Sequence, residues 1–538
     1  LVVSVLNSPN ALSIGRLGEF ANNTWRGWID GFKISIGVAR YTANFSPPAF
    51  ESLSLTQAAP HFAMPIRTSA ATFWLYASLD KIFAYDGSTY ANITRQTASI
   101  DVDYTGSETR EINGTLLGGT PIINNGTDIP QYWTGIALSS KMSDLSNWPS
   151  TLRAKVVRAF GPFLVAINVT KSGTNLPHMV KWSHPADPGT LPSSWDETDP
   201  TLDAGEFELP DVDAGILLDA LPLSETLYLY KESSVWKMRF VGGRDIFSTG
   251  QAAWLTTTGI LAPRCVCVTG DGKRHVWASQ DDILWHDGNQ VRSLLTNRRR
   301  KELFNAIDTS NYLNCFIFTN PLRSEVWFCY PTSGNTHPDK AMIFNYQFGG
   351  EQWPTTDADG ITFRNATIGA IQGASDELWS DGTDIWDDDT GPWSQLARRR
   401  VVLCGTDAGK FYKLDNGATR DGTPFTGTLQ RTGLSVTGKK RNGEWVVDHY
   451  VNKLVRRLWP KISGGAVNVR LGTQELVDGP ITWSPVAVHD PSANLYADPG
   501  PIGGAAIGVE FSSDVAFRIS GYSLELQTLG RFRSGLRS

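Results

Sequence analysis

Short aromatic strands joined by acidic turns recur along the middle of the chain. The clearest pair is residues 77–87 and 278–288, each of which reads as a strand, an acidic turn, a second strand and an Asp-Gly turn. An Asp-Gly pair provides the positive φ angles that a tight hairpin needs. The four turns are at Asp80, Asp86, Asp281 and Asp287, and looser copies of the pattern occupy residues 227–236, 379–386 and 406–415. The pattern predicts repeated β-hairpins.

The spacing of these hairpins predicts a β-propeller. Asp80 and Asp281 lie 201 positions apart, which corresponds to about four repeats of 40–50 residues. We therefore expect an all-β fold with an irregular β-propeller of about five to seven blades across residues 51–435. Crowded turn signals predict an insertion near residues 105–150. A second insertion is predicted at residues 184–215, which are rich in Pro and Asp and poor in apolar periodicity, as an exposed loop or a subunit contact.

The last hundred residues carry a different strand pattern. Apolar positions dominate residues 446–458 and 466–471, and they alternate almost strictly along residues 516–526. Alternation of this kind is typical of strands with one buried face. We expect a C-terminal β-platform across residues 436–538, with its last strand returning to the propeller to close it.

Composition argues against a nucleic-acid groove and against a membrane-spanning segment. The 538 residues are enough for two to four domains, and 41% hydrophobic with 19% charged residues is typical of an ordered globular protein. A net charge of −6 gives no basic excess, which a nucleic-acid groove would normally show. No apolar stretch approaches the roughly 20 residues needed to cross a bilayer, so we expect no membrane insertion.

The five cysteines do not form a metal motif. Cys265 and Cys267 would share one face of a strand, but no further ligands are near in the sequence, and no CxxC spacing repeats as a zinc site requires. The set, Cys265, Cys267, Cys315, Cys329 and Cys404, is therefore predicted to be free, mostly buried thiols.

Carboxylates are the most plausible catalytic groups, and they gather at Asp381, Asp384 and residues 387–389. The surrounding sequence is similar to the Asp box of sialidases, which is a blade turn and not a catalytic centre. A glycosidase needs two carboxylates held across the scissile bond, and the sequence identifies no such pair. Residues 357–360 and 386–391 could hold calcium, but acidic turns without the full twelve-residue loop favour ordinary solvated turns.

Other catalytic signatures are missing from the sequence. It contains no GxSxG, HExxH or P-loop motif. His275, His286 and His449 are isolated in the sequence and are predicted to be packing or surface residues. We expect a protein that is not an enzyme, and we assign no catalytic, cofactor-binding or metal residue and no cofactor.

Three basic clusters interrupt the chain, at residues 298–301, 398–400 and 439–441, and the first opens a short helical stretch. Contacts with phosphate would give affinity that falls steeply with salt. The favoured interpretation is subunit interfaces, with phosphate contact as the alternative.

Residues 28–48, "WIDGFKISIGVARYTANFSPP", resemble the last strands of laminin-G or concanavalin-like jelly rolls. Such a fold needs about eight strands, so the first domain, residues 1–50, is expected to be the C-terminal part of a jelly roll whose remainder precedes residue 1, or an appendage. No binding residue follows from this resemblance.

Residues 122–133, with "NNGTDIPQYW", and the ending "FRISGYSLELQTLGR" resemble tail nozzle or packaged-DNA stabilisation proteins of short-tailed bacteriophages. The resemblance implies a structural virion protein that forms a distal nozzle ring and provides the conduit and closure for genome DNA.

The same resemblance implies the partners: a hexameric ring of identical copies, tail adaptor and portal proteins, tail fibres or tailspikes, and transient non-specific contact with DNA. It places the protein in the virion tail, after assembly in the host bacterial cytoplasm. The alternative is a carbohydrate-binding adhesin or, with less support, a propeller glycosidase.

Overall fold

The computed structural model describes most of the chain between residues 53 and 531. The described ranges are 53–54, 59–68, 72–86, 89–110, 112–133, 135–243, 245–252, 258–347, 355–357, 362–370, 400–407, 409–414, 419–420, 423–424, 426–439, 445–448, 450–475, 480–515 and 517–531. The predicted jelly-roll segment, the acidic residues 379–391 and His449 lie outside these ranges.

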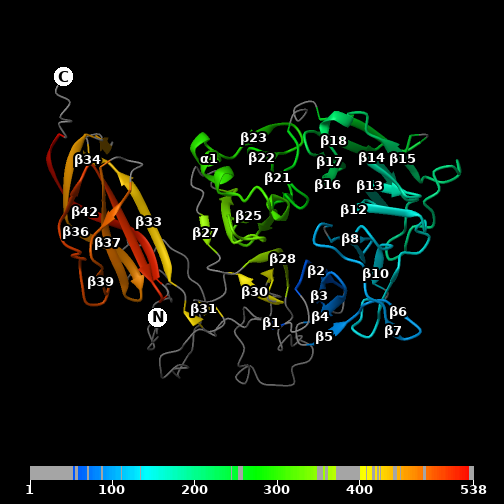
Figure 1. Cartoon of the computed structure of the whole chain (residues 1–538), viewed down its shortest axis with the longest axis horizontal. Coiled ribbons are helices and arrows are strands. Elements are labelled where there is room, and N and C mark those ends of the chain that lie inside the picture. The colour runs from blue at the N-terminus through cyan, green and yellow to red at the C-terminus, as the bar shows by residue number, and fades with distance from the viewer. Residues whose placement is uncertain are drawn as a thin grey trace, which may run out of the picture. The chain divides into compact units, whose positions relative to one another are not determined.

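Seven four-stranded antiparallel sheets between Leu53 and Leu414 follow one another in a ring, so this part of the chain folds as a seven-bladed β-propeller (Figure 1). Blade 1 contains β2 (Phe62–Arg67), β3 (Thr72–Ala77), β4 (Ile82–Tyr85) and β5 (Tyr90–Asn92). Blade 2 contains β8 (Asn113–Leu117), β9 (Thr120–Asn124), β10 (Gln131–Trp133) and β11 (Met142–Asp144). Blade 3 contains β12 (Leu152–Phe160), β13 (Phe163–Lys171), β14 (Thr174–Trp182) and β15 (Gly205–Glu208).

Blade 4 contains β16 (Leu217–Leu223), β17 (Thr226–Lys231), β18 (Val235–Phe240) and β19 (Phe247–Gln251). Blade 5 contains β20 (Val266–Val268), β21 (His275–Ala278), β22 (Ile283–His286) and β23 (Val291–Ser293). Blade 6 contains β24 (Phe316–Asn320), β25 (Glu325–Tyr330), β26 (Lys340–Asn345) and β27 (Thr355–Asp357). Blade 7 contains β28 (Phe363–Ala370), β29 (Arg400–Thr406), β30 (Lys410–Leu414) and β1 (Leu53–Ser54).

The predicted repeat is confirmed at the level of single turns. Asp80 follows β3 and Asp281 follows β21, so the two acidic turns occupy the same place in blades 1 and 5, four blades apart. Each carboxylate accepts a hydrogen bond from the serine two residues earlier, at 2.7 Å for Asp80 and 3.2 Å for Asp281. Such side-chain bonds to a nearby group hold tight turns.

The hydrophobic core lies in the gaps between blades. Separate groups of buried apolar residues fill the gaps between blades 1 and 2, 2 and 3, 3 and 4, 6 and 7, and 7 and 1, while one larger group spans blades 4 to 6. Because a middle strand of a blade packs against a neighbour on both faces, all six residues of β3 are buried. This explains why such strands read as continuous apolar and aromatic runs.

The ring is closed by the N-terminal end of the described chain. Leu53 pairs with Phe411 and Ser54 with Lys410, so β1 supplies the outer strand of blade 7. The expectation that the last strand closes the propeller is wrong, because β42 (Phe517–Arg531) pairs with β36 (Val451–Gly464) in the C-terminal unit. Alternation identifies a half-buried strand but says nothing about its partner.

The prediction of an insertion near residues 105–150 is wrong for most of that stretch, because residues 113–144 form blade 2. Its strands have only three to five residues, so turn residues dominate the local composition. The stretch 184–215 does contain a long connection, between β14 and β15. It is anchored and not simply exposed, since Trp195 is buried against Trp148, with ring centroids 4.6 Å apart.

The C-terminal unit begins at Asn416, earlier than the predicted boundary at 436, because β33 (Gly427–Leu434) pairs with β41 (Ala506–Ser513). One sheet contains β33, β41, β37 (Val467–Gln474), β38 (Thr482–Trp483) and β39 (Ala487–His489). The other contains β40 (Ile502–Gly504), β36 and β42. Apolar residues of both sheets share one core, so this unit is a two-sheet sandwich.

The remaining elements are short. They are the hairpins β6 (Gln96–Thr97) with β7 (Ile100–Asp101), β31 (Thr419–Arg420) with β32 (Thr423–Pro424) and β34 (Val436–Lys439) with β35 (Trp445–Val447), the helix α1 (Asn297–Ala306), and the 3-10 turns η1 (Val212–Ala214) and η2 (Tyr312–Asn314). Among the described residues, no helix is long and apolar enough to cross a membrane.

Candidate functional site

Charged side chains from five blades meet at one end of the propeller axis. The loops that enter blades 1, 2 and 5 supply His61, Glu108 and Arg264, and the first strand of blade 7 supplies Arg364. Blades 2 and 5 are not neighbours in the ring, so their residues can share one pocket only at the axis. We call the set the axial cluster: His61, Glu108, Arg264, His337, Arg364 and Asp407.

Arg364 is the centre of the axial cluster. Its Nη1 donates to Glu108 Oε2 at 2.9 Å, its Nε donates to Asp407, and Nη1 also lies 2.9 Å from the ring nitrogen Nε2 of His61. Arg264 donates from Nη1 to the backbone oxygen of Arg364 at 3.1 Å. The planar guanidinium thus ties loops of several blades together through directed, charge-assisted hydrogen bonds.

The electrostatics of the axial cluster are balanced. Burial, together with the Arg364 charge, lowers the pKa of His61 to about 4, so this imidazole is neutral at pH 7. Burial alone would raise the pKa of Asp407, but hydrogen bonds from His337 and Thr362 and the Arg364 charge hold it well below its usual range. Burial would likewise raise the pKa of Glu108, but the hydrogen bond from Arg364 together with the charges of the neighbouring basic side chains lowers it.

The pocket at the axial cluster has a free volume of about 20 Å³, enough for one water molecule. The ion pairs therefore leave little free space at this end of the propeller axis, and we call this filled end the plug.

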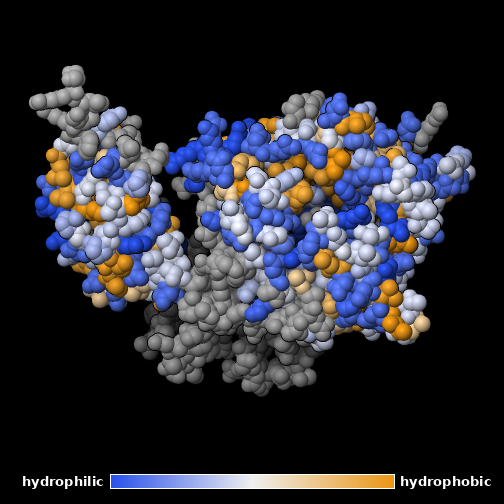
Figure 2. All heavy atoms as spheres, in the orientation of Figure 1, coloured by the Kyte–Doolittle hydropathy of each residue, from blue (hydrophilic) through white to orange (hydrophobic). Residues whose placement is uncertain are grey.

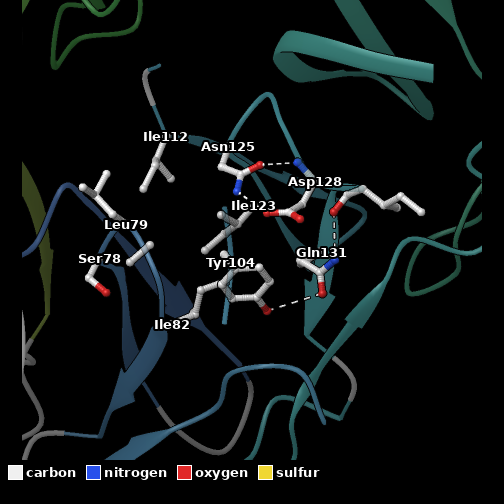
Figure 3. A pocket seen from close by; sticks show the side chains of 11 residues that line it. Ser78, Leu79, Ile82, Tyr104, Ile112, Ile123, Asn125, Asp128 and Gln131 are labelled. Carbon is white, nitrogen blue, oxygen red and sulfur yellow. Dashed lines mark hydrogen bonds between the residues drawn. The ribbon is translucent and has the colours of Figure 1, made fainter. Parts of the chain in front are cut away.

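A second polar network surrounds a small cavity between blades 1 and 2 (Figure 3). Asn125 donates to Asp128 Oδ2 at 2.7 Å and accepts from the backbone of Asp128 at 2.8 Å. Arg95, in the loop after blade 1, donates to Asp128 Oδ1 at 3.2 Å and lies over the ring of Tyr104 at 4.8 Å. The Tyr104 hydroxyl reaches Gln131 at 3.4 Å.

Segment 122–133, which carries the family resemblance, is therefore part of a set of contacts that connects neighbouring blades, and we call this set the clamp. On its other side, Asn124 donates to the backbone oxygen of Ala154 in blade 3 at 2.9 Å. Trp133 is 1% exposed and packs edge-on against Phe73 of blade 1 at 5.4 Å. The residues that carry the family resemblance thus hold blades 1, 2 and 3 together.

The histidines that are isolated in the sequence are not isolated in the structure. His275 and His286 are paired across β21 and β22, and the Tyr230 hydroxyl of blade 4 lies 2.8 Å from Nδ1 of His275 and 2.9 Å from Nε2 of His286. All three side chains are fully buried, so of the two predicted alternatives, packing or surface, His275 and His286 are packing residues. The repeated hairpin is the signal that could have found the pair, since its register places residue 275 opposite 286.

The first basic cluster forms the start of α1, as predicted. Arg298 and Arg299 pair with Glu302 at 3.0 and 3.1 Å, and Arg300 pairs with Asp282 at 2.5 Å. These guanidinium groups are thus matched by carboxylates of the same chain. Residues 398 and 399 lie outside the described ranges.

All five cysteines are free and buried, as predicted. Burial raises the pKa of the Cys267 thiol well above its usual value, which makes it a poor metal ligand or nucleophile. Within the described ranges, no group of three or more histidine, cysteine, aspartate or glutamate residues could hold a metal ion.

Comparison with known proteins yields structural likeness alone. No family model matches the sequence, and no curated protein matches it. Among solved structures, the chain is similar to the WD40 β-propeller domain of Doa1, with 8% identity, a TM-score of 0.36, and 66% of this chain and 97% of that chain covered. For the β-propeller domain of Cps50 (Swd1) from Myceliophteria thermophila the values are 9%, 0.39, 68% and 99%. For the WD40 domain of Toxoplasma gondii coronin they are 8%, 0.36, 68% and 87%.

Proposed function

We propose that this protein is a non-enzymatic structural subunit of a bacteriophage tail and that its copies form the distal nozzle ring. The resemblance at residues 122–133 and 516–531 supports this class. In this proposal the ring lies in the virion tail, binds adaptor or portal proteins and carries fibres or tailspikes. It is assembled in the host cytoplasm and provides the conduit and closure for genome DNA.

The observation that carries the proposal is a pair of long edge strands in the C-terminal unit. Among the described strands, β33 with 8 residues and β42 with 15 residues each have a partner on one side only. Natural edge strands are usually short or blocked by charge. Leu429 on β33 is 48% exposed and Leu529 on β42 is 56% exposed. Such edges suit contacts between identical copies, which form a ring when the rotation closes.

The plug at the axial cluster supports a scaffolding role for the propeller within the ring. In this proposal the propeller, whose axial pocket has a volume of about 20 Å³, is a scaffold and not a pore. In this proposal DNA passes through the centre of the ring, where several copies bound the channel and contact it only transiently.

Electron microscopy of the full-length protein in negative stain, combined with its mass in solution, tests the proposal. We expect a six-fold ring with a central channel. Leu429→Arg or Leu529→Arg should break the ring into smaller species, because a charge cannot be buried unpaired in the contact. Val212→Arg, at a propeller residue that is 59% exposed, is the control and should leave the ring intact. A folded monomer at micromolar concentration would refute the proposal.

A further inference from the structure

An aromatic cleft opens between blades 3 and 4, at the opposite end of the strands from the axial cluster. Its walls are the turn between β12 and β13, the turn between β16 and β17, and the residues that end β18 and begin β19. Its volume is about 540 Å³, within the roughly 300–1,000 Å³ of small-molecule sites. Figure 2 shows hydrophobic residues among the polar surface over the part of the propeller where Figure 1 labels β16–β18.

The base of the cleft is a fixed group of phenylalanines. Phe163 packs edge-on against Phe247 at 4.9 Å, and Phe160 lies 5.9 Å from Phe247. These three rings are 3–9% exposed, so packing holds them in place. Phe240 lies 5.7 Å from Phe163 but is itself 58% exposed. One ring is thus presented to solvent by a rigid aromatic support.

Polar groups of both kinds lie beside this ring. Ser224, Glu225 and Arg239 line the same cleft and are exposed. A carboxylate only accepts hydrogen bonds, a guanidinium only donates them, and a hydroxyl does both. A ligand that satisfies all three combines donors, acceptors and an apolar face. Since Glu225 and Arg239 carry opposite charges, the cleft favours neither a cation nor an anion.

We propose that this cleft binds a neutral pyranose unit of a polysaccharide. The C–H face of the sugar stacks on Phe240, one hydroxyl donates to Glu225 and another accepts from Arg239. A purely apolar peptide would leave both charged groups without new partners at the rim. The inference goes beyond the nozzle proposal, because it gives each copy of the propeller a saccharide contact of its own.

Saturation-transfer NMR and calorimetry on the full-length protein test the site, with methyl glucoside, methyl galactoside, methyl mannoside and the matching methyl glucuronide as probes. We expect millimolar binding of at least one neutral glycoside and weaker binding of the glucuronide. Phe240→Ala should reduce affinity about tenfold, since stacking is lost. Glu225→Gln should reduce it severalfold, because a charge-assisted bond becomes a neutral one.

Tyr312→Ala is the matched control, since this aromatic residue is 38% exposed and lies outside the cleft, and it should leave affinity unchanged. Failure of every neutral glycoside, or tighter binding of the glucuronide, would overturn the proposal. A Phe240→Ala protein that forms a smaller oligomer in solution but keeps its saccharide affinity would also overturn it, because the cleft would then be a contact between copies. An intact ring without saccharide binding refutes this inference alone, and a monomer that binds refutes the nozzle alone.

Discussion

The buried network of Tyr230, His275 and His286 predicts that the propeller loses stability in mild acid. His275 Nε2 lies 3.1 Å from the backbone oxygen of Pro222, so this nitrogen carries the proton and Nδ1 accepts from the Tyr230 hydroxyl. The phenol oxygen then accepts from Nε2 of His286, whose Nδ1 accepts from the backbone of Gly288 at 3.3 Å. When both imidazoles are neutral, each of their nitrogens and the phenol hydroxyl has a hydrogen-bond partner. A proton added to either imidazole would point at another donor.

The magnitude follows from the pKa values. Burial lowers the pKa of His275 to about 4, and burial with the nearby His275 lowers that of His286 to about 2. Unfolded histidine has a pKa near 6.5, so the unfolded chain binds more protons as the pH falls below that value, and stability falls with it. Between pH 7.5 and pH 5 each histidine should cost about 2 kcal/mol, and the pair about 4 kcal/mol.

Thermal unfolding at several pH values between 7.5 and 5 provides the assay. For a unit of this size the loss corresponds to roughly 5–10 °C in Tm. Carboxylates with lowered pKa values, such as Asp407, act only at lower pH. The double variant His275→Gln/His286→Gln should lose most of the pH dependence. His61→Gln is the control and should remove only its own smaller share, since the pKa of His61 is also lowered, to about 4. An unchanged pH dependence in the double variant would refute the reasoning.

Two further variants test buried polar groups. Asp128→Asn removes the charge that pairs with Arg95 and should cost about 2–3 kcal/mol in unfolding free energy, whereas Asp144→Asn, at the more exposed partner of Arg95, should cost under about 1 kcal/mol; equal losses in denaturant titration would contradict the clamp. Lys453→Met leaves three backbone carbonyl groups without the ammonium that donates to them and should destabilise the C-terminal unit by about 3 kcal/mol. The exposed Lys461→Met is the control, and a Lys453 variant as stable as that control would show that the buried bonds contribute little.

The propeller could be predicted from the sequence because its repeat is local. The acidic turns at Asp80 and Asp281 are fixed by bonds to residues two positions away, so the pattern survives in any blade. Blade 2 resembles an insertion in the sequence because its strands are too short to show alternation between their turns. The boundary near residue 416 was misplaced because β33 pairs with β41, a strand more than seventy residues later.

The candidate sites could not be predicted in the same way. The axial cluster draws His61, Glu108 and Arg264 from loops and Arg364 from β28, at positions up to about 300 residues apart. Only closure of the ring brings these segments to one axis. Nothing local distinguishes them from ordinary loop charges. The aromatic cleft likewise depends on how the turns of blades 3 and 4 meet.

The sequence by itself determined the class of fold, the hairpin repeat and the state of the cysteines, because turn chemistry, strand period and ligand spacing act over a few residues. Tertiary structure alone decided the number of blades, the strand that closes the ring, the pairing of β42 with β36 and the meeting of charges at the axis. These features depend on pairing between strands that are far apart in the sequence. The packing of whole strand and sheet faces selects each partner, and a short segment of sequence carries no signal of that choice.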